Sequence, residues 1–422
     1  MLPRSVYHPA VPYGQGHLRP YHGGAERYVL EHALAGNRWG HESVIGTTDA
    51  WDMSWLVSRS GLHIQRKMDI WNGIEIVRFP VLHPPVQNVF RAVLRRISKC
   101  GPDRYYYPNP FIPSLHRWLS IERGFDFLHA NAMPFMLYEG WRYSEKFGKG
   151  LVSVPHANVG EKYRRVKALH YFSGCQKRIL QNSSFVAAQS LFEKGLYTEM
   201  GIPEERIHIS GSGIDPSEFA GGSGERGLKR LGVKGPVILS LTAHSLDRGT
   251  AHIIEACRIL LKKGRDFTLV LAGPVLQDVE DYIDSDKKLT EEFGDKLVLT
   301  GYVSREDRID LLSAADIVLL PSRLDCFGIV VLEAWVSGKP IIGCWSGAMP
   351  DIISDGNNGF LVSWGDIASL KNRIEILLDN RALGIGMGEN GRKKVLQRWT
   401  WEKITDRFYR RLSQCCPEVS RP

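Results

Sequence analysis

The sequence lacks the features that place a protein in a membrane, outside the cell or around a structural metal. No uninterrupted apolar run reaches the ~18 residues that a membrane-spanning helix requires. The start of the chain, MLPRSVYHPAVP, has neither an apolar core segment nor a small-residue cleavage site, which argues against export. The seven cysteines include no C-x2-C pair and no zinc-like spacing with histidine, so we expect reduced thiols and a cytoplasmic location.

Further absences exclude other classes of protein. The chain has no fixed-period repeat, no RNA-recognition, zinc-finger or helix-turn-helix pattern, and no G-x-G-x-x-G after an early strand. These absences argue against a repeat protein, a nucleic-acid-binding protein and a nicotinamide-dependent dehydrogenase. The tripeptide Asp284-Ser285-Asp286 has the D-x-D form of some metal sites, but it lies in a charged stretch that is predicted to be a solvated helix surface. We therefore expect no bound metal.

What the chain does have is room for two domains and a regular alternation of elements. Its 422 residues exceed what one hydrophobic core usually organises. In the second half, short apolar runs alternate with helical patterns, which is typical of a parallel sheet covered on both faces. Ligands of such sheets collect at the carboxyl ends of the strands, so the loops there are expected to face one cleft. The predicted strands of this half are Val237–Leu241, Phe267–Leu271, Leu297–Leu299, Ile317–Leu320 and Ile341–Ile342.

The first half follows the same pattern with weaker signals. Its predicted helix covers Gly24 to Leu34, and the glycine- and serine-rich stretch from Gly211 to Gly227 marks the boundary between two domains. We therefore expect an α/β protein with two doubly wound parallel sheets. The predicted strands of the first half are Val44–Ile45, Phe125–Leu128, Val152–Val154 and Phe185–Ala188.

The most informative segment runs from Pro321 to Asp351. A helix is predicted from about Ile329 to Ser337, between two buried strands. The first N–H groups of such a helix have no partner inside the helix, and the helix dipole favours an anion such as a diphosphate at that end. The amides expected to bind the anion are those of Phe327, Gly328, Ile329 and Val330.

Two carboxylates flank this predicted anion site. Asp325 lies just before the helix, and Glu333 lies about one turn inside it. Carboxylate oxygens accept hydrogen bonds from vicinal hydroxyl groups, which sugars and riboses offer. A simpler interpretation is that both acids only cap the helix and balance its dipole.

The whole segment resembles the E-x7-E signature of the retaining glycosyltransferases of family 4. The resemblance implies a GT-B fold, in which two Rossmann-like domains face a cleft. Residues 1–211 would form the acceptor-side domain, residues 212–398 the nucleotide-sugar domain, and residues 399–422 a helix that crosses back to the first domain. In the family, the first carboxylate binds hydroxyl groups of the donor sugar and the second binds the ribose, which assigns Asp325 and Glu333. Asp325 is one methylene shorter than the usual glutamate, which leaves the identity of the sugar open.

Further positions match the family. Gly23 and Gly24 stand in its N-terminal glycine loop, which reaches the donor phosphate. His156 follows a predicted strand and matches the histidine that hydrogen-bonds the donor sugar near the reacting centre. Arg248 stands for a lysine that neutralises the diphosphate, and its fixed fork of donors makes it a competent substitute. His129 matches a strand-end histidine, which we expect in the core rather than in the cleft.

The largest departure from the family lies in the loop that carries Arg248. Ala243 stands where the family has an arginine that also neutralises the diphosphate. Losing this cation weakens stabilisation of the leaving group unless another group replaces it, because charge accumulates on the diphosphate as the glycosidic bond breaks. His244 and Arg323 are the candidate replacements. Alternatively, the site has lost catalysis and keeps only binding.

The resemblance therefore implies a retaining enzyme that moves a sugar from a nucleoside diphosphate donor to an acceptor hydroxyl. No Asp or Glu matches a nucleophile position, so we expect front-face substitution, with no metal and no cofactor besides the donor substrate. The predicted catalytic residues are His156, Arg248 and Asp325. The alternatives are a nucleotide-sugar-binding protein of the same fold without turnover and a PLP-dependent phosphorylase, whose lysine context the chain does not match.

The net charge of +8 and the pI near 9.0 suggest an anionic partner. A nucleotide-sugar or an anionic lipid fits the sequence better than a nucleic acid does. The basic segments 88–99 and 162–167 are either lipid-docking surfaces that present a lipid-linked acceptor or ordinary helices with a solvated basic side. The predicted acceptor is a sugar, a lipid-linked molecule or a small molecule, and the predicted location is the cytoplasm, with possible peripheral contact at the inner face of the cell membrane.

Overall fold

The protein is described from a computed structural model. The described residues are 24–50, 55–56, 59, 61, 63–83, 110–132, 135–157 and 174–416. The predicted basic segments 88–99 and 162–167 lie outside them, as does Gly23. Within the described residues, no helix is both long enough and apolar enough to cross a bilayer.

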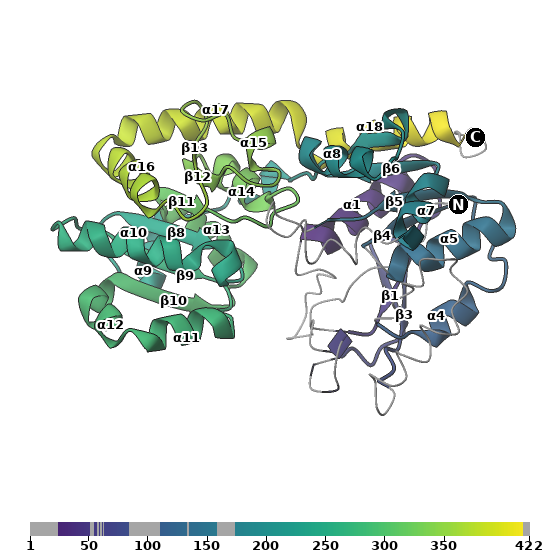
Figure 1. Ribbon diagram of the computed structural model, residues 1–422, viewed down its shortest axis with the longest axis horizontal. Coiled ribbons are helices and arrows are strands. Elements are labelled where there is room, and N and C mark those ends of the chain that lie inside the picture. The colour runs from purple at the N-terminus through teal and green to yellow at the C-terminus, as the bar shows by residue number, and fades with distance from the viewer. Residues whose placement is uncertain are drawn as a thin grey trace. The chain divides into compact units, whose positions relative to one another are not determined.

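The chain divides into two compact units (Figure 1). Unit 1 comprises residues 1–157, 163–212 and 402–422. Unit 2 comprises residues 158–162 and 213–401. Each unit contains a parallel sheet with helices around it, as the alternation of apolar runs and helical patterns predicted.

Unit 1 contains a four-stranded parallel sheet with the order β4-β5-β6-β7. A second sheet has the order β1-β3-β2, with β1 parallel and β2 antiparallel to β3. The sequence did not predict β2 or β3, because their apolar residues alternate with polar ones and form no continuous apolar run. The strands are β1 Val44–Thr48, β2 Met68–Trp71, β3 Ile74–Phe79, β4 Phe127–Asn131, β5 Gly150–Val154, β6 Phe185–Ala188 and β7 Ile207–Ile209.

The helices of unit 1 come from both ends of the chain. The final helix, α18, packs on the first, α1: the Tyr409 hydroxyl donates a hydrogen bond to the carbonyl oxygen of His32 over 2.6 Å, and both residues are buried. The end of the chain therefore completes the core of unit 1. The helices are α1 Gly24–Arg38, α4 Pro113–Trp118, α5 Phe135–Phe147, α7 Gly174–Asn182, α8 Leu191–Glu199 and α18 Trp401–Cys415.

Unit 2 contains a six-stranded sheet in which all strands are parallel, with the order β10-β9-β8-β11-β12-β13. The chain builds one half of the sheet outward from β8 and then returns to build the other half outward from β11. The order therefore reverses between β8 and β11, and ligands bind outside the carboxyl ends of strands at such a switch point. The strands are β8 Val237–Leu241, β9 Thr268–Ala272, β10 Leu297–Gly301, β11 Ile317–Leu320, β12 Ile341–Cys344 and β13 Phe360–Val362.

Helices cover both faces of this sheet, and each face has its own apolar core. Successive strand residues alternate between the two cores: Val237 and Leu239 belong to one, and Ile238 belongs to the other. The first core includes residues of α13, α14, α15 and α17, and the second includes residues of α10, α11, α12 and α16. The helices of unit 2 are α9 Gly224–Leu231, α10 Thr250–Lys262, α11 Gln277–Ser285, α12 Lys287–Phe293, α13 Arg305–Ala314, α14 Ile329–Val336, α15 Met349–Ile352, α16 Ile367–Asp379 and α17 Arg381–Arg398.

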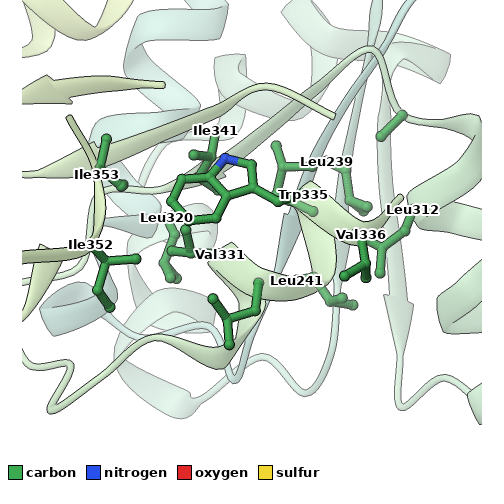
Figure 2. Packing of buried hydrophobic residues seen from close by; sticks show 14 of the residues in the cluster. Leu239, Leu241, Leu312, Leu320, Val331, Trp335, Val336, Ile341, Ile352 and Ile353 are labelled. Atoms are coloured by element: carbon green, nitrogen blue, oxygen red, sulfur yellow. The ribbon is translucent and has the colours of Figure 1, made fainter. Parts of the chain in front are cut away.

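Helix α14 is anchored through the indole of Trp335. Figure 2 shows this side chain among apolar residues of β8, β11, β12 and α15. It is fully buried, and its Nε1 donates a hydrogen bond to the carbonyl oxygen of Asn358 over 2.7 Å. Helix α17 approaches so closely that a Cβ atom at Gly391 would overlap the indole ring. Helix α14 is therefore fixed by packing of Trp335 against α17, while its N-terminus lies at the carboxyl edge of the sheet.

Candidate functional site

The loop after β11 turns sharply into α14 at Gly328. The helix begins at Ile329, as predicted, and Gly328 precedes it with φ of +84°. This left-handed conformation favours glycine, and a Cβ atom at this position would overlap the side chain of Met349. The left-handed backbone therefore favours glycine, and any other residue would also force the flexible end of Met349 to move.

The N-terminus of α14 presents backbone rather than side chains. Among the described residues, no side chain caps this helix. Phe327 is buried and meets Trp399 edge to face, with 6.1 Å between ring centroids, while Ile329 and Val330 are half-buried. The first amides of an α-helix have no acceptor within the helix, so this terminus suits an anion.

Arg248 and Asp325, which the sequence analysis assigned to the same ligand, are bonded to each other. Arg248 ends the 3-10 helix η4, Leu246–Arg248, after β8. Its Nη1 donates a short hydrogen bond to Asp325 Oδ1 and a longer one, of 3.4 Å, to the buried Ser322 Oγ. The Asp325 carboxylate raises the pKa of Arg248, so the guanidinium stays charged. Asp325 Oδ2 is buried and accepts no hydrogen bond from any described residue.

A second ion pair joins the same two loops, with the arginine now in the loop after β11 and the carboxylate in the loop after β8. Arg323 donates to Asp247 Oδ1 from Nε, over 3.1 Å, and from Nη2, and its backbone N–H donates to the Asp247 carbonyl oxygen over 3.3 Å. The guanidinium carbon of Arg323 also lies 4.7 Å from the centre of the Trp364 ring. Because Asp247 and Arg248 are adjacent in the chain, the pair with Arg323 fixes the backbone that carries Arg248.

Glu333 is bound by an arginine that the sequence analysis did not single out. Arg308, on α13, donates to Glu333 Oε2 from Nε over 3.1 Å and from Nη2 through a short bond. The side chain of Glu333 is 8% exposed and that of Arg308 is 34% exposed. Both bonds fall on Oε2, which leaves Oε1 as the acceptor for a ligand hydroxyl. No local pattern marks Arg308, because the two residues meet only through the packing of α13 beside α14.

His244 is a poor substitute for the cation absent at Ala243. Its side chain is fully buried, and burial lowers its pKa to about 4, so the ring is neutral near pH 7. Arg323 keeps its charge but directs two of its donors at Asp247. Arg248 is consequently the arginine of these loops that contacts a predicted ligand-binding carboxylate.

Two other predicted residues, His156 and Gly24, belong to unit 1. Gly24 is the first residue of α1. His156 follows β5, is half-buried and has φ of +50°, which is unusual for a residue with a side chain. Burial lowers the pKa of His156 to about 4, and its ring meets that of Tyr28 edge to face at 5.3 Å. His129, on β4, is 1% exposed, so the expected core position of this histidine is confirmed.

The predicted site residues therefore fall into two groups. The structure brings together Arg248, Asp325 and the start of α14, at the point where the strand order of unit 2 reverses. Glu333 lies on the same helix. This edge offers a permanent cation, helix amides and two carboxylates, each with one oxygen that is not bonded to its arginine partner. It can bind a ligand that has both negative charge and hydroxyl groups.

Comparisons with known proteins agree with this geometry. The sequence model described as Glycosyltransferase Family 4 matches residues 22–218, and the one described as Glycosyl transferases group 1 matches residues 226–394. An uncharacterised glycosyltransferase of Methanocaldococcus jannaschii is 25% identical over 351 residues, covering 79% of this chain and 83% of the relative. The MMP alpha-(1->4)-mannosyltransferase of Mycolicibacterium hassiacum is 26% identical over 322 residues, covering 71% of this chain and 73% of the relative.

Solved structures show the same fold. The crystal structure of the Anabaena protein HepE in complex with UDP-glucose matches with a TM-score of 0.72 at 19% identity, covering 97% of this chain and 99% of that one. The family models lie on both sides of the boundary between the units and together leave little of the chain unmatched. The chain therefore belongs to the group 1 glycosyltransferases of family 4 and has their GT-B fold.

Proposed function

We propose that the protein is a retaining glycosyltransferase that takes its sugar from a nucleoside diphosphate donor. The observation that carries the proposal is the meeting of Arg248, Asp325 and the N-terminus of α14 at the switch point of the unit 2 sheet. A site of this kind matches a diphosphate that bears a sugar on one side and a ribose on the other. The presence of UDP-glucose in the HepE crystal structure, which has the same fold, supports this class of donor.

Each group of the site has a role in this proposal. The amides at the start of α14 and the guanidinium of Arg248 bind the diphosphate. Asp325 Oδ2, a buried acceptor that receives no hydrogen bond from the described residues, accepts one from a hydroxyl of the donor sugar. Glu333 Oε1 accepts one from the ribose, while Arg308 holds the other oxygen of that carboxylate.

The proposed reaction needs no covalent intermediate. The bond between the anomeric carbon and the diphosphate oxygen breaks, and the acceptor oxygen forms its new bond on the same face of the sugar. The departing diphosphate keeps the electron pair of the bond that breaks and takes the proton of the acceptor hydroxyl, whose oxygen supplies the electron pair of the new bond. Arg248 and the helix amides stabilise the charge that accumulates on the diphosphate, which is the largest electrostatic demand of the step. We propose that His156 hydrogen-bonds the reacting sugar and that no metal is needed.

The acceptor is a hydroxyl of a sugar, a lipid-linked molecule or a small molecule, in the synthesis of a glycan, glycolipid or other glycoconjugate. We place this activity in the cytoplasm, where nucleotide-sugars and reduced thiols coexist. Six free cysteines lie among the described residues, four of them buried, which suits that location.

The donor is identified by adding UDP-glucose, GDP-mannose, ADP-glucose and dTDP-glucose separately and measuring the shift in melting temperature. A ligand that binds only the folded state raises this temperature by mass action. The E333Q variant should lose ~10-fold or more in affinity for the stabilising donor, because a hydrogen bond to a charged group contributes ~1.5–3 kcal/mol.

The D310N variant is the matched control for E333Q. Asp310 is also a buried acid of unit 2, on the same helix as Arg308, and it is paired with Arg226 over 2.8 Å. We expect D310N to lower stability while donor affinity stays within about twofold of wild type, because Asp310 is bonded to residues of the α9 region instead of α14. Equal affinities for E333Q and wild type would contradict the proposed ribose contact.

A second candidate function is donor binding without turnover, which Ala243 favours because a diphosphate-binding cation is absent there. Release of the nucleoside diphosphate from the stabilising donor distinguishes the two functions. Hydrolysis or transfer supports the enzyme, whereas tight binding without release over many hours, with each class of acceptor present, supports the binding protein. NMR of the anomeric proton of the product tests retention directly.

A further inference from the structure

A buried carboxyl group that the proposed reaction does not use lies beside His156. Glu193 is on α8 and is fully buried in unit 1. Its Oε1 accepts a hydrogen bond from the backbone N–H of Ala157 over 2.7 Å, and its Oε2 accepts one from the backbone N–H of Gln189 over 2.8 Å. Ala157 lies three residues after the end of β5, and Gln189 directly follows β6, so one side chain joins two adjacent strand ends.

The bond to the Ala157 N–H fixes the peptide group between His156 and Ala157. His156 has φ of +50°, a conformation that costs a residue with a side chain about 1–2 kcal/mol. Pro155 precedes it with a ring-fixed φ, so the backbone is constrained on both sides of the histidine. Without the carboxylate, the His156 backbone would be free to relax to an ordinary conformation, and the ring would move with it.

Burial opposes the charge of this carboxyl group. Burial raises the pKa of Glu193 to about 7, which means that ionisation in the folded protein is unfavourable relative to water. The ionised form accepts from both N–H donors, whereas protonation makes one of the two oxygens a weaker acceptor. The ionised form therefore holds the pair of backbone donors best, at a cost in desolvation.

We propose that Glu193 is a positioning residue, which acts through the Ala157 amide to hold His156 in its left-handed conformation and its imidazole in place for the donor sugar. This inference rests on the role proposed above for His156. It predicts that Glu193 changes the rate of transfer without contributing to donor affinity, because the donor-binding groups Arg248 and Glu333 belong to unit 2.

The test is a double-mutant cycle between positions 156 and 193, measured on the full chain with the donor that stabilises it. E193A is expected to lower kcat by ~10- to 100-fold, the scale of a displaced catalytic group, with donor Kd within about twofold of wild type. H156A is expected to lower kcat by at least as much. In the H156A background, E193A should cause no further loss, because Glu193 acts only through that histidine.

Two further variants separate positioning from stability. S190A removes the side chain that caps the same helix, where Ser190 Oγ accepts from the Glu193 N–H over 3.2 Å, so it lowers the melting temperature but should leave kcat unchanged. E193Q preserves shape and one acceptor oxygen, so it should fold even if E193A does not, with a loss in kcat between those of wild type and E193A.

The outcomes distinguish this inference from the proposed function. Two outcomes would overturn the positioning role and leave the function of His156 intact. In one, the effects of E193A and H156A on kcat multiply in the double variant. In the other, both position-193 variants keep wild-type kcat while H156A is impaired. Wild-type kcat in H156A would overturn the proposed role of His156 and the inference with it. In either case the assignment of Arg248, Asp325 and Glu333 would stand on its own donor-binding data.

Discussion

The ion pair between Arg248 and Asp325 makes a counter-intuitive prediction: removing the acidic charge should improve binding of the nucleoside diphosphate alone. In the folded protein Asp325 neutralises the arginine that is proposed to bind the diphosphate. A diphosphate must therefore share Arg248 with a carboxylate of its own sign. D325N removes this competitor and leaves a side chain of the same shape.

The magnitude follows from the geometry. Two unit charges about 4 Å apart interact with ~4 kcal/mol at an effective dielectric constant of ~20. The side chains of Arg248 and Asp325 are 25% and 13% exposed, so water screens part of this interaction. We take about 1–2 kcal/mol as the part that the ligand recovers, which corresponds to ~5- to 30-fold tighter binding of the nucleoside diphosphate.

The same substitution should act in the opposite direction on the sugar. The buried Oδ2 of Asp325 is the proposed acceptor for a sugar hydroxyl, and a neutral amide is a weaker acceptor than a carboxylate. The ratio between the affinities for nucleotide-sugar and nucleoside diphosphate should therefore fall by ~10-fold or more, and kcat should fall with it. Added salt should shrink the gain for the nucleoside diphosphate in part, because salt screens the exposed portion of this ion pair.

Isothermal titration of wild type, D325N and the D310N control with the nucleoside diphosphate measures the first effect, and titration with the nucleotide-sugar measures the second. Unchanged or weaker binding of the nucleoside diphosphate to D325N would refute the reasoning, since it would mean that Asp325 does not compete with the ligand for Arg248. An equal gain in D310N would show that only the overall charge of unit 2 matters.

Two predictions concern stability. G391A should lower the free energy of unfolding of unit 2 by about 1–3 kcal/mol in urea titrations, because its Cβ would overlap the indole packed against α17; G386A, on the same helix with no atom within 4 Å of its Cβ, should not destabilise, and equal losses in both variants would contradict the packing argument. Acid should destabilise unit 1, because burial lowers the pKa of several of its histidines, to about 3 at His129 and to about 4 at His156 and His208, below the ~6.5 of an unfolded histidine, and each removes ~1.4 kcal/mol per pH unit as the pH falls from ~6.5 to its folded pKa. Glu193, whose pKa burial raises to about 7, opposes one of them from pH 7 down to ~4.5, so the loss in urea titrations should steepen below pH 4.5, and an even slope from pH 6.5 to 4 would contradict these assignments.

The strands and the central helix of unit 2 were predictable because their signals are local. The apolar runs at Val237–Leu241 and Ile317–Leu320 coincide with β8 and β11, and the helix predicted to begin at Ile329 begins there. Each signal depends on residues a few positions apart: β-branched runs for the strands, and a glycine before an apolar stretch for the helix. The α/β class that these signals predicted is confirmed, and so is the GT-B fold that the family resemblance implied.

The partners of the site residues were not predictable. Arg248 and Asp325 are 77 residues apart, and Arg308 and Glu333 are 25 residues apart. Arg248 was predicted to bind the phosphate and Asp325 the sugar, and nothing in the sequence indicated that they pair when the chain folds. The predictions for the basic segment 88–99 concern residues outside those described, so lipid docking stays a prediction.

By itself, the sequence determined the class of the fold, the position of the helix terminus that we propose binds the anion, and the acidic residues on either side of it, because strand, turn and helix preferences act between near neighbours. Only the tertiary structure decided which charges neutralise each other, which carboxylate oxygens remain as acceptors, and which buried acid holds the backbone of His156. These contacts depend on the order of strands in the sheet and on the packing of helices beside it, where residues distant in the chain first come within bonding distance.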